Sequence, residues 1–165
     1  MRRIAVVVAM ILGFNIVAFA SSTVPLFRID RNTNANAVYY DLRLNDQGEV
    51  DITNPIDSYW LLHARNGDRE EITSFQRRAY GFNFAINAQG EYILTLTAVR
   101  ERPIRIVKIG DEWKAEIVIN GQPVYLTSVF VESKSGFLGI PSVSWYVLYG
   151  IDPISGEEVS EKIIP

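Results

Sequence analysis

The sequence has 165 residues, a formal net charge of −3 and no cysteine. A mildly acidic chain disfavours nucleic acid and anionic membranes as partners, because both attract basic proteins. Without cysteine the fold cannot depend on disulfides, so a hydrophobic core must stabilise it. His63 is the single histidine, which leaves zinc sites and histidine-based triads without their usual groups. No Gly-x-Ser-x-Gly elbow or glycine-rich phosphate loop occurs, so we expect no cofactor and no catalytic residue.

The first 20 residues are typical of a cleavable secretion signal. Arg2 and Arg3 precede a mostly apolar run, and the small residues Ala18 and Ala20 occupy the positions that a signal peptidase reads. We therefore expect cleavage after Ala20 and export to the periplasm or the extracellular space, with an uncleaved anchor as the alternative. Residues 21–165 would then form one β-rich domain of 145 residues without a membrane span. Loss of the two arginines changes the net charge from −3 to −5.

The first strand predicted after the signal spans residues 36–44, where apolar side chains alternate with polar ones. The residues in and around it also show part of a calcium-loop pattern. Asp30, Asn32, Asn34 and Asp41 fall at the first, third, fifth and twelfth positions of such a loop. Ala35 replaces the glycine that the loop needs, and Asn and Asp are common in ordinary turns. The sequence therefore predicts no metal, with calcium at these four residues as the alternative.

A second strand is predicted near residues 59–65. Within it His63 shares a face with Tyr59, Leu61 and Arg65, a stripe that could face a ligand. The commoner role of such a histidine is that of a half-buried residue bonded to a neighbour.

One helix is predicted over Arg69 to Tyr80. Asp68 fits its N-cap with Glu71 three residues later, and Gly81 fits its C-cap. Three apolar residues recur at helical spacing: Ile72, Phe75 and Ala79. The apolar stripe is narrow, so this helix should lie on a sheet or close one end of a barrel.

The remaining segments again alternate with period two, over 92–99, 113–119 and 143–149. Asn120-Gly121 is the strongest hairpin signal, because both residues tolerate positive φ. The segment 124–131 is apolar on both faces, which indicates a strand at the centre of a sheet or under the helix.

These elements predict a mainly β fold: an antiparallel meander barrel or a two-sheet sandwich of about eight or nine strands, with one helix near residues 69–80. The large side chains expected to point inward are Tyr40, Trp60, Leu94, Leu96, Trp113, Phe130 and Trp145. Such aromatics either fill a barrel completely or line a cup for one small apolar ligand.

Arginine is the main candidate for recognition. The clusters Arg77-Arg78-Ala79-Tyr80 and Arg100-Glu101-Arg102 could bind a carboxylate or phosphate through their planar guanidinium groups. The interpretation that we favour is that these arginines form ion pairs with acidic groups on the protein's own surface.

Several blocks of the chain are distinctive in combination. These blocks are 26–36, Tyr59-Trp60, 76–81 and the closing Tyr149-Gly150-Ile151-Asp152 with Ser155-Gly156 and Glu161. In them the chain resembles a family of exported bacterial proteins known only as a domain of unknown function, over about Leu26 to Pro165. The resemblance implies a single exported domain and brings no activity, substrate or cofactor.

The function that these observations favour is a non-catalytic binding or interaction module of the cell envelope. Its partner would be an unknown protein, glycan or small molecule, bound by Arg31, Asn32, Asn34, Tyr59, Trp60, His63, Arg77, Arg78 and Tyr80. One alternative is a β-barrel carrier of a small hydrophobic ligand. Another is a hydrolase that uses carboxylates distant in sequence but close in space.

Overall fold

The computed structural model describes residues 22–135 and 141–165, so the predicted signal peptide lies outside the described residues. The described part is mainly β, as predicted, with eleven strands rather than eight or nine. Within it, no helix has both the length and the apolar character needed to cross a membrane.

The elements have the following bounds in chain order. They are β1 (Ser22–Arg31), β2 (Asn34–Leu44), β3 (Ile56–Leu62), the 3-10 helix η1 (His63–Arg65), β4 (Asp68–Glu71), α1 (Arg77–Tyr80), β5 (Phe82–Ile86), β6 (Tyr92–Leu96), β7 (Ile104–Ile109), β8 (Glu112–Ile119), β9 (Gln122–Ser135), β10 (Pro141–Ile151) and β11 (Glu158–Ile163).

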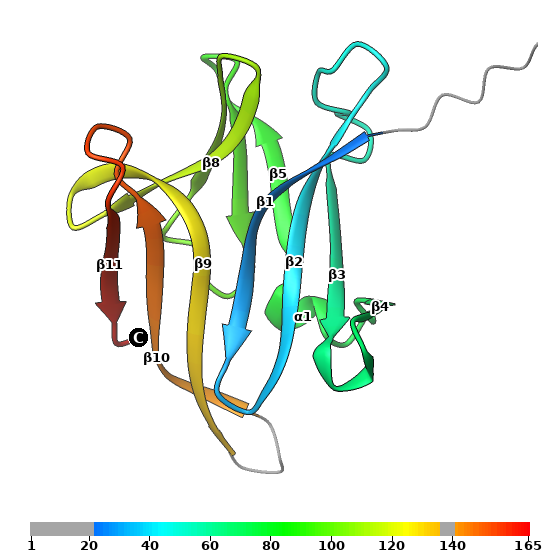
Figure 1. Cartoon of the computed structure of the whole chain (residues 1–165), viewed down its shortest axis with the longest axis vertical. Helices are drawn as coiled ribbons and strands as arrows, with labels where there is room; N and C mark the ends of the chain where they lie inside the picture. The colour runs from blue at the N-terminus through cyan, green and yellow to red at the C-terminus, as the bar shows by residue number, and fades with distance from the viewer. Residues whose placement is uncertain (1–21, 136–140) are drawn as a thin grey trace, which may run out of the picture.

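The strands form one sheet that bends into two facing layers. Their order is β4-β3-β2-β1-β9-β8-β7-β6-β5, with β10 on the other edge of β9 and β11 beyond it. On one edge of β9, residues 122–125 pair with β8 and residues 128–131 pair with β1. The sheet divides at this point. Strands β5, β6 and β7, drawn in green, lie behind the layer of β10, β9, β1, β2 and β3 (Figure 1). The curled sheet agrees with the predicted barrel or sandwich.

Strand β9 is the centre of the sheet, as its two apolar faces predicted. It pairs with three strands, of which only β1 runs parallel to it. The predicted hairpin before it is also confirmed, because β8 and β9 are joined by Asn120 and Gly121 with φ of 51° and 78°.

The core lies between the two layers. Tyr40 on β2 stacks on Phe27 with ring centroids 4.7 Å apart, and it meets Phe82 on β5 edge-on at 6.5 Å. Five of the seven large side chains expected to point inward are buried: Tyr40, Trp60, Leu94, Leu96 and Trp113.

The prediction was wrong for Phe130 and Trp145. Both are only partly buried, and their rings lie together at 5.7 Å. On β10 it is Tyr146 and Leu148 that are buried in the core, although 143–149 does alternate as predicted. Large apolar residues occupy both faces of this strand, so the alternation identified two faces without showing which of them is inward.

The predicted helix over 69–80 was also wrong over most of its length. Residues 68–71 form β4, whose Glu70 and Glu71 pair with β3, and only the last four residues are α-helical. The actual capping box begins at Thr73, which exchanges hydrogen bonds with Gln76. The predicted cap residue Asp68 is therefore the first residue of an edge strand.

Candidate functional site

Four of the predicted binding residues meet at the end of the molecule formed by the β1–β2 hairpin and α1. The Arg31 guanidinium lies 4.3 Å from the centre of the Trp60 ring, and Trp60 meets Tyr80 edge-on at 5.0 Å. Asn34 accepts hydrogen bonds from Nε and Nη2 of Arg31 at 3.3 and 3.2 Å. The plane of Arg31 is thus held by the tryptophan ring on one side and by an amide at its edge.

The turn that ends in α1 places two further arginines beside Tyr80. The Tyr40 hydroxyl donates a 2.8 Å hydrogen bond to the Tyr80 carbonyl oxygen, which ties α1 to the core. Gly81 ends the helix where a Cβ would lie only 2.2 Å from the Arg77 carbonyl oxygen. Arg77 and Arg78 are exposed on this turn. We call Arg31, Trp60, Arg77, Arg78 and Tyr80 the arginine site.

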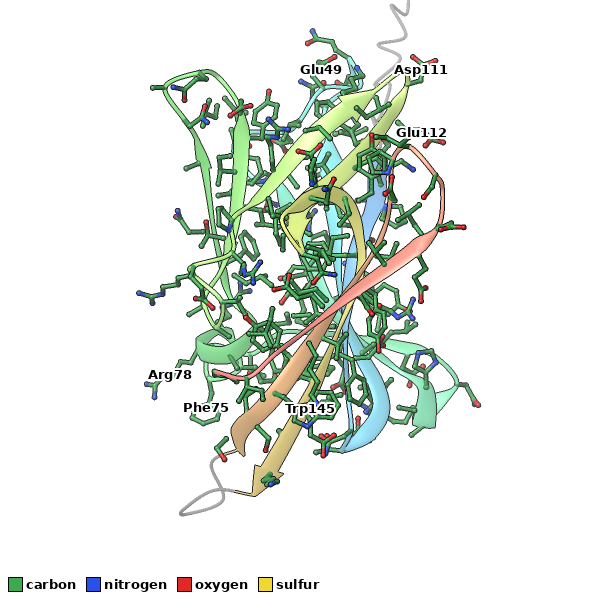
Figure 2. The ribbon with its side chains drawn as sticks, turned by 90° about the vertical axis from the view of Figure 1, so that its left-hand side faces the viewer. Glu49, Phe75, Arg78, Asp111, Glu112 and Trp145 are labelled. Atoms are coloured by element: carbon green, nitrogen blue, oxygen red, sulfur yellow. The ribbon has the colours of Figure 1, made fainter. Side chains whose placement is uncertain are left out.

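The arginines of this site are not neutralised by ion pairs. Among the described residues, six of the ten arginines lie within 4.0 Å of a carboxylate. The four arginines without such a partner are Arg31, Arg77, Arg78 and Arg100. The other end of the molecule carries Glu49, Asp111 and Glu112, whereas Arg78 and Phe75 project near α1 (Figure 2). Three of the four guanidinium groups without a carboxylate partner, those of Arg31, Arg77 and Arg78, therefore lie at one end of the molecule, away from these acidic groups.

Two buried polar atoms beside the arginine site have no hydrogen-bond partner in the part of the chain that the structure describes. They are Nε1 of Trp60 and Oδ1 of Asn36. Trp60 pairs with Val38 on β2, and Asn36 lies two residues before Val38, so both side chains belong to the same face of neighbouring strands. Unpaired buried polar atoms are rare in folded proteins, because each costs about 1–3 kcal/mol. They give this end of the molecule an unused donor and an unused acceptor.

The structure places the other predicted residues elsewhere or gives them another role. Asn32 bonds to the backbone of Ser133, which ties the hairpin to β9. Tyr59 alternates with Trp60 and lies on the opposite face of β3. His63 follows the end of β3 and is exposed in η1, so both the strand-face prediction and the half-buried alternative were wrong.

The oxygens proposed for calcium bond mainly to the chain itself. Asp30 pairs with Arg28 at 3.0 Å, and the Asn34 Oδ1 atom accepts from Arg31 and from the Asn36 backbone. Asp41 lies in the middle of β2, away from the hairpin. No cluster of three or more His, Cys, Asp or Glu side chains suited to a metal occurs in the described ranges.

Sequence reasoning missed a pair of buried carboxylates on the outward face of β2 and β3. Asp41 and Asp57 are direct cross-strand partners and are 6% and 8% exposed. Asp57 is held by Arg43 Nη2 at 2.7 Å and Arg69 Nη2 at 2.6 Å. The Tyr59 hydroxyl donates to Asp41 Oδ2 at 3.0 Å. Only the pairing register, which local alternation does not reveal, brings the two carboxylates together.

The charges of this pair affect its titration. Burial, and next the charge of Asp57, raise the pKa of Asp41 above its usual value, although the Tyr59 hydrogen bond opposes this shift. Burial and the hydrogen bond to Asp41 raise the pKa of Tyr59 to about 12. The Arg69 guanidinium covers the Tyr59 ring at 3.7 Å. Both oxygens of Asp57 are thus occupied by arginines, and one oxygen of Asp41 by a tyrosine.

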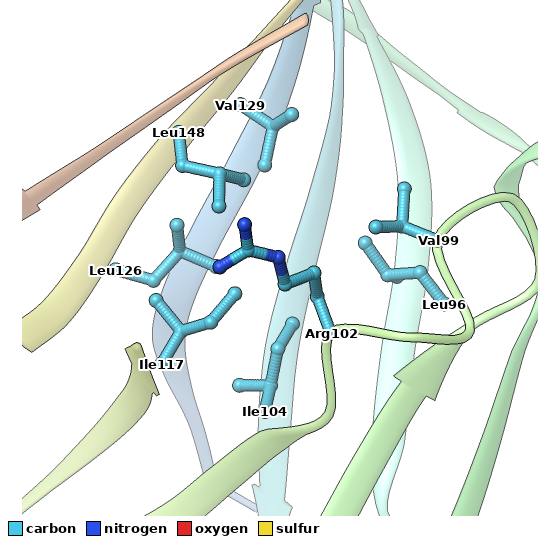
Figure 3. A pocket seen from close by; sticks show the side chains of 8 residues that line it. All are labelled: Leu96, Val99, Arg102, Ile104, Ile117, Leu126, Val129 and Leu148. Atoms are coloured by element: carbon cyan, nitrogen blue, oxygen red, sulfur yellow. The ribbon is translucent and has the colours of Figure 1, made fainter. Parts of the chain in front are cut away.

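Buried apolar side chains of both layers form one hydrophobic core. An internal cavity of about 10 Å³ lies among apolar side chains and the stem of Arg102 (Figure 3). Arg102 forms an ion pair with Glu161 at 2.7 Å and also donates to the Val118 carbonyl oxygen. The favoured prediction of ion pairing is therefore confirmed for Arg102, whereas it was wrong for Arg77, Arg78 and Arg100, which have no carboxylate partner among the described residues. A second, open depression of about 470 Å³ lies at the surface near Trp113, Lys108 and Asp111.

A family described as a domain of unknown function, DUF4833, matches residues 27–162. This confirms the resemblance suggested by the sequence blocks. No curated protein and no solved structure matches the chain.

Proposed function

Since the chain belongs to the DUF4833 family of unknown function, we propose a function from its geometry: an exported, non-catalytic binding module that holds an anionic group of a protein or glycan at the arginine site. The observation that carries this proposal is the gathering of Arg31, Arg77 and Arg78, none with a carboxylate partner among the described residues, around Trp60 and Tyr80.

The chemistry of the site suits a carboxylate or a phosphate. Guanidinium groups bind both through paired hydrogen bonds, and such charge-assisted bonds are about twice as strong as neutral ones. Arg31 is already held in place by Trp60 and Asn34, so little side-chain entropy would be lost when a ligand binds. Arg77 and Arg78 are exposed and can adjust to the partner's shape.

Two other functions have less support. A carrier needs a pocket of about 300–1,000 Å³ that covers most of its ligand. The cavity between the layers measures about 10 Å³, and the depression of about 470 Å³ near Trp113 is open to solvent. A hydrolase based on Asp41 and Asp57 needs at least one carboxylate oriented toward a substrate. Asp57 is occupied by two arginines, and the remaining oxygen of Asp41 is buried.

The arginine site can be tested with defined polyanions. We expect immobilised protein to bind poly-glutamate or polyphosphate, and not uncharged dextran, with an affinity that falls between about 50 and 300 mM salt. Arg77→Gln combined with Arg78→Gln should weaken this binding at least about tenfold, because two charge-assisted contacts are lost. Biolayer interferometry measures both effects.

Arg100→Gln provides a matched control, since Arg100 is also exposed and has no ion pair. It should change the affinity by less than about twofold. Equal losses in the Arg100 variant and in the double variant would show that the binding depends on overall charge, and the proposal would then be wrong.

Export is tested separately by mass spectrometry of the protein isolated from its own host. The sequence pattern around Ala18 and Ala20 predicts a mature chain that begins at Ser21. A chain that still begins at Met1 and needs detergent for extraction would contradict the predicted signal cleavage.

A further inference from the structure

The described part of the sheet ends in three edge strands that differ in charge. β4 consists of four charged residues, and β11 contains three charged residues among its six. β5 has the sequence Phe-Asn-Phe-Ala-Ile and carries no charge. Charged side chains on an edge strand oppose the addition of another strand, and uncharged apolar ones permit it. Of the three edges, β5 is therefore the one that can accept a partner.

The geometry of β5 leaves both its backbone and its side chains incompletely covered. Among the described residues, β6 is the only strand that pairs with it. Phe82 and Phe84 are half-buried against Tyr40 and Tyr92, and Ile86 is 52% exposed. An added strand would satisfy the free backbone groups and cover this apolar row.

We propose that β5 pairs with β5 of a second copy of this chain, antiparallel across a two-fold axis at Phe84. This arrangement puts Asn83 of one copy opposite Ala85 of the second copy, and Phe82 opposite Ile86 of the second copy. Each exposed Ile86 is then covered by an aromatic ring.

Charge favours the antiparallel direction. Arg77 and Arg78 precede β5, and the Asn87–Glu91 turn follows it. Antiparallel pairing keeps Arg77 and Arg78 of the two copies apart and places them beside the turn of the other copy, where Arg105 already neutralises Glu91 at 2.8 Å. Parallel pairing would bring the four arginines of the two copies together. Because only five residues pair on each side, the interface is small and the dimer is weak.

The test is sedimentation velocity of the purified protein between about 10 µM and 1 mM, a range in which weak association is measurable. We expect the mean sedimentation coefficient to rise with concentration. Asn83→Lys combined with Ala85→Lys puts like charges opposite each other twice and should weaken association about tenfold. Asn83→Lys combined with Ala85→Glu puts opposite charges there and should restore association or strengthen it.

Both positions are exposed, so these variants should fold. Ser160→Lys, on the β11 edge, is the matched control and should leave association unchanged. A monomeric wild-type protein at 1 mM would exclude self-pairing and leave an extended foreign peptide as the occupant of this edge. Equal weakening by the two double variants would also overturn the proposed two-fold register. None of these outcomes depends on anion binding at the arginine site.

Discussion

Both faces of β2 and β3 contain buried residues, but in different chemical environments. Inward residues of β2 such as Tyr40 and Leu42 are 0% exposed in an apolar core. On the outward face, Asp41 and Asp57 are almost as inaccessible, beneath the side chains of charged and aromatic neighbours. Burial of an apolar group is favourable by itself, whereas burial of a charge is tolerated only while its partners remain. Burial of the inward apolar residues therefore stabilises the fold directly, whereas burial of Asp41 and Asp57 is tolerated only while their partners remain in place.

The largest expected effect is on the inward face. Leu42→Ala should lower the free energy of unfolding by about 3 kcal/mol, because it removes buried methyl groups and leaves a cavity. Chemical denaturation measures the loss. Leu61→Ala, at a half-buried outward position of β3, is the matched truncation and should cost less than about 1 kcal/mol. Comparable losses would mean that the outward face is packed as tightly as the core.

A smaller loss is expected when the outward network is broken. Asp57→Ala leaves Arg43 and Arg69 without their carboxylate and should cost about 2 kcal/mol, since both arginines keep some contact with water. Further replacement of both arginines by Met should recover most of this loss, because no charge is then left unpaired. If the triple variant is as unstable as Asp57→Ala, the penalty does not come from unpaired charge.

The smallest effect is a pH dependence due to Asp41. Its pKa is raised in the folded state by burial and by Asp57, so folding favours the protonated form. The resulting stability is fully present below the unfolded pKa of about 3.9 and is lost as pH rises through the raised folded value. The stability difference, Asp41→Asn minus wild type, should therefore become more favourable to the variant between pH 4 and pH 7. Thermal melts of both proteins measure it, and a difference that does not vary with pH would contradict the raised pKa.

Local patterns were sufficient for much of the fold. Trp113 lies between Glu112 and Lys114, and Leu94 and Leu96 flank Thr95, so the burial of these apolar residues followed from period two. Trp145 was misassigned because β10 has large residues on both faces. Gly150 could have corrected this, since a Cβ there would lie 2.8 Å from the Tyr125 carbonyl oxygen. A glycine in line with Tyr146 and Leu148 marks the crowded face of the strand.

The site was predictable only in part, because a local pattern identifies residue types but does not show which side chains the fold brings together. Arg31, Arg77, Arg78 and Tyr80 were found as residue types suited to recognition, and the structure connects them through Trp60. The predicted strand extended to Arg65, but β3 ends at Leu62, so His63 lies outside it. The start of the helix was misplaced because Asp68 and Glu71 imitate the capping box that Thr73 and Gln76 form.

The parallel pairing of β1 with β9 has a consequence for the order of folding. Arg28 pairs with Ser128, one hundred residues later in the chain, whereas β1 pairs with β2 through a tight hairpin. Local hairpins can form early, but contacts between distant segments must first overcome the entropy of closing a long loop. We expect the β1–β9 contact to form late, so that two separate meanders precede the closed sheet. Until β9 is synthesised, the outer edge of β1 has no strand to pair with.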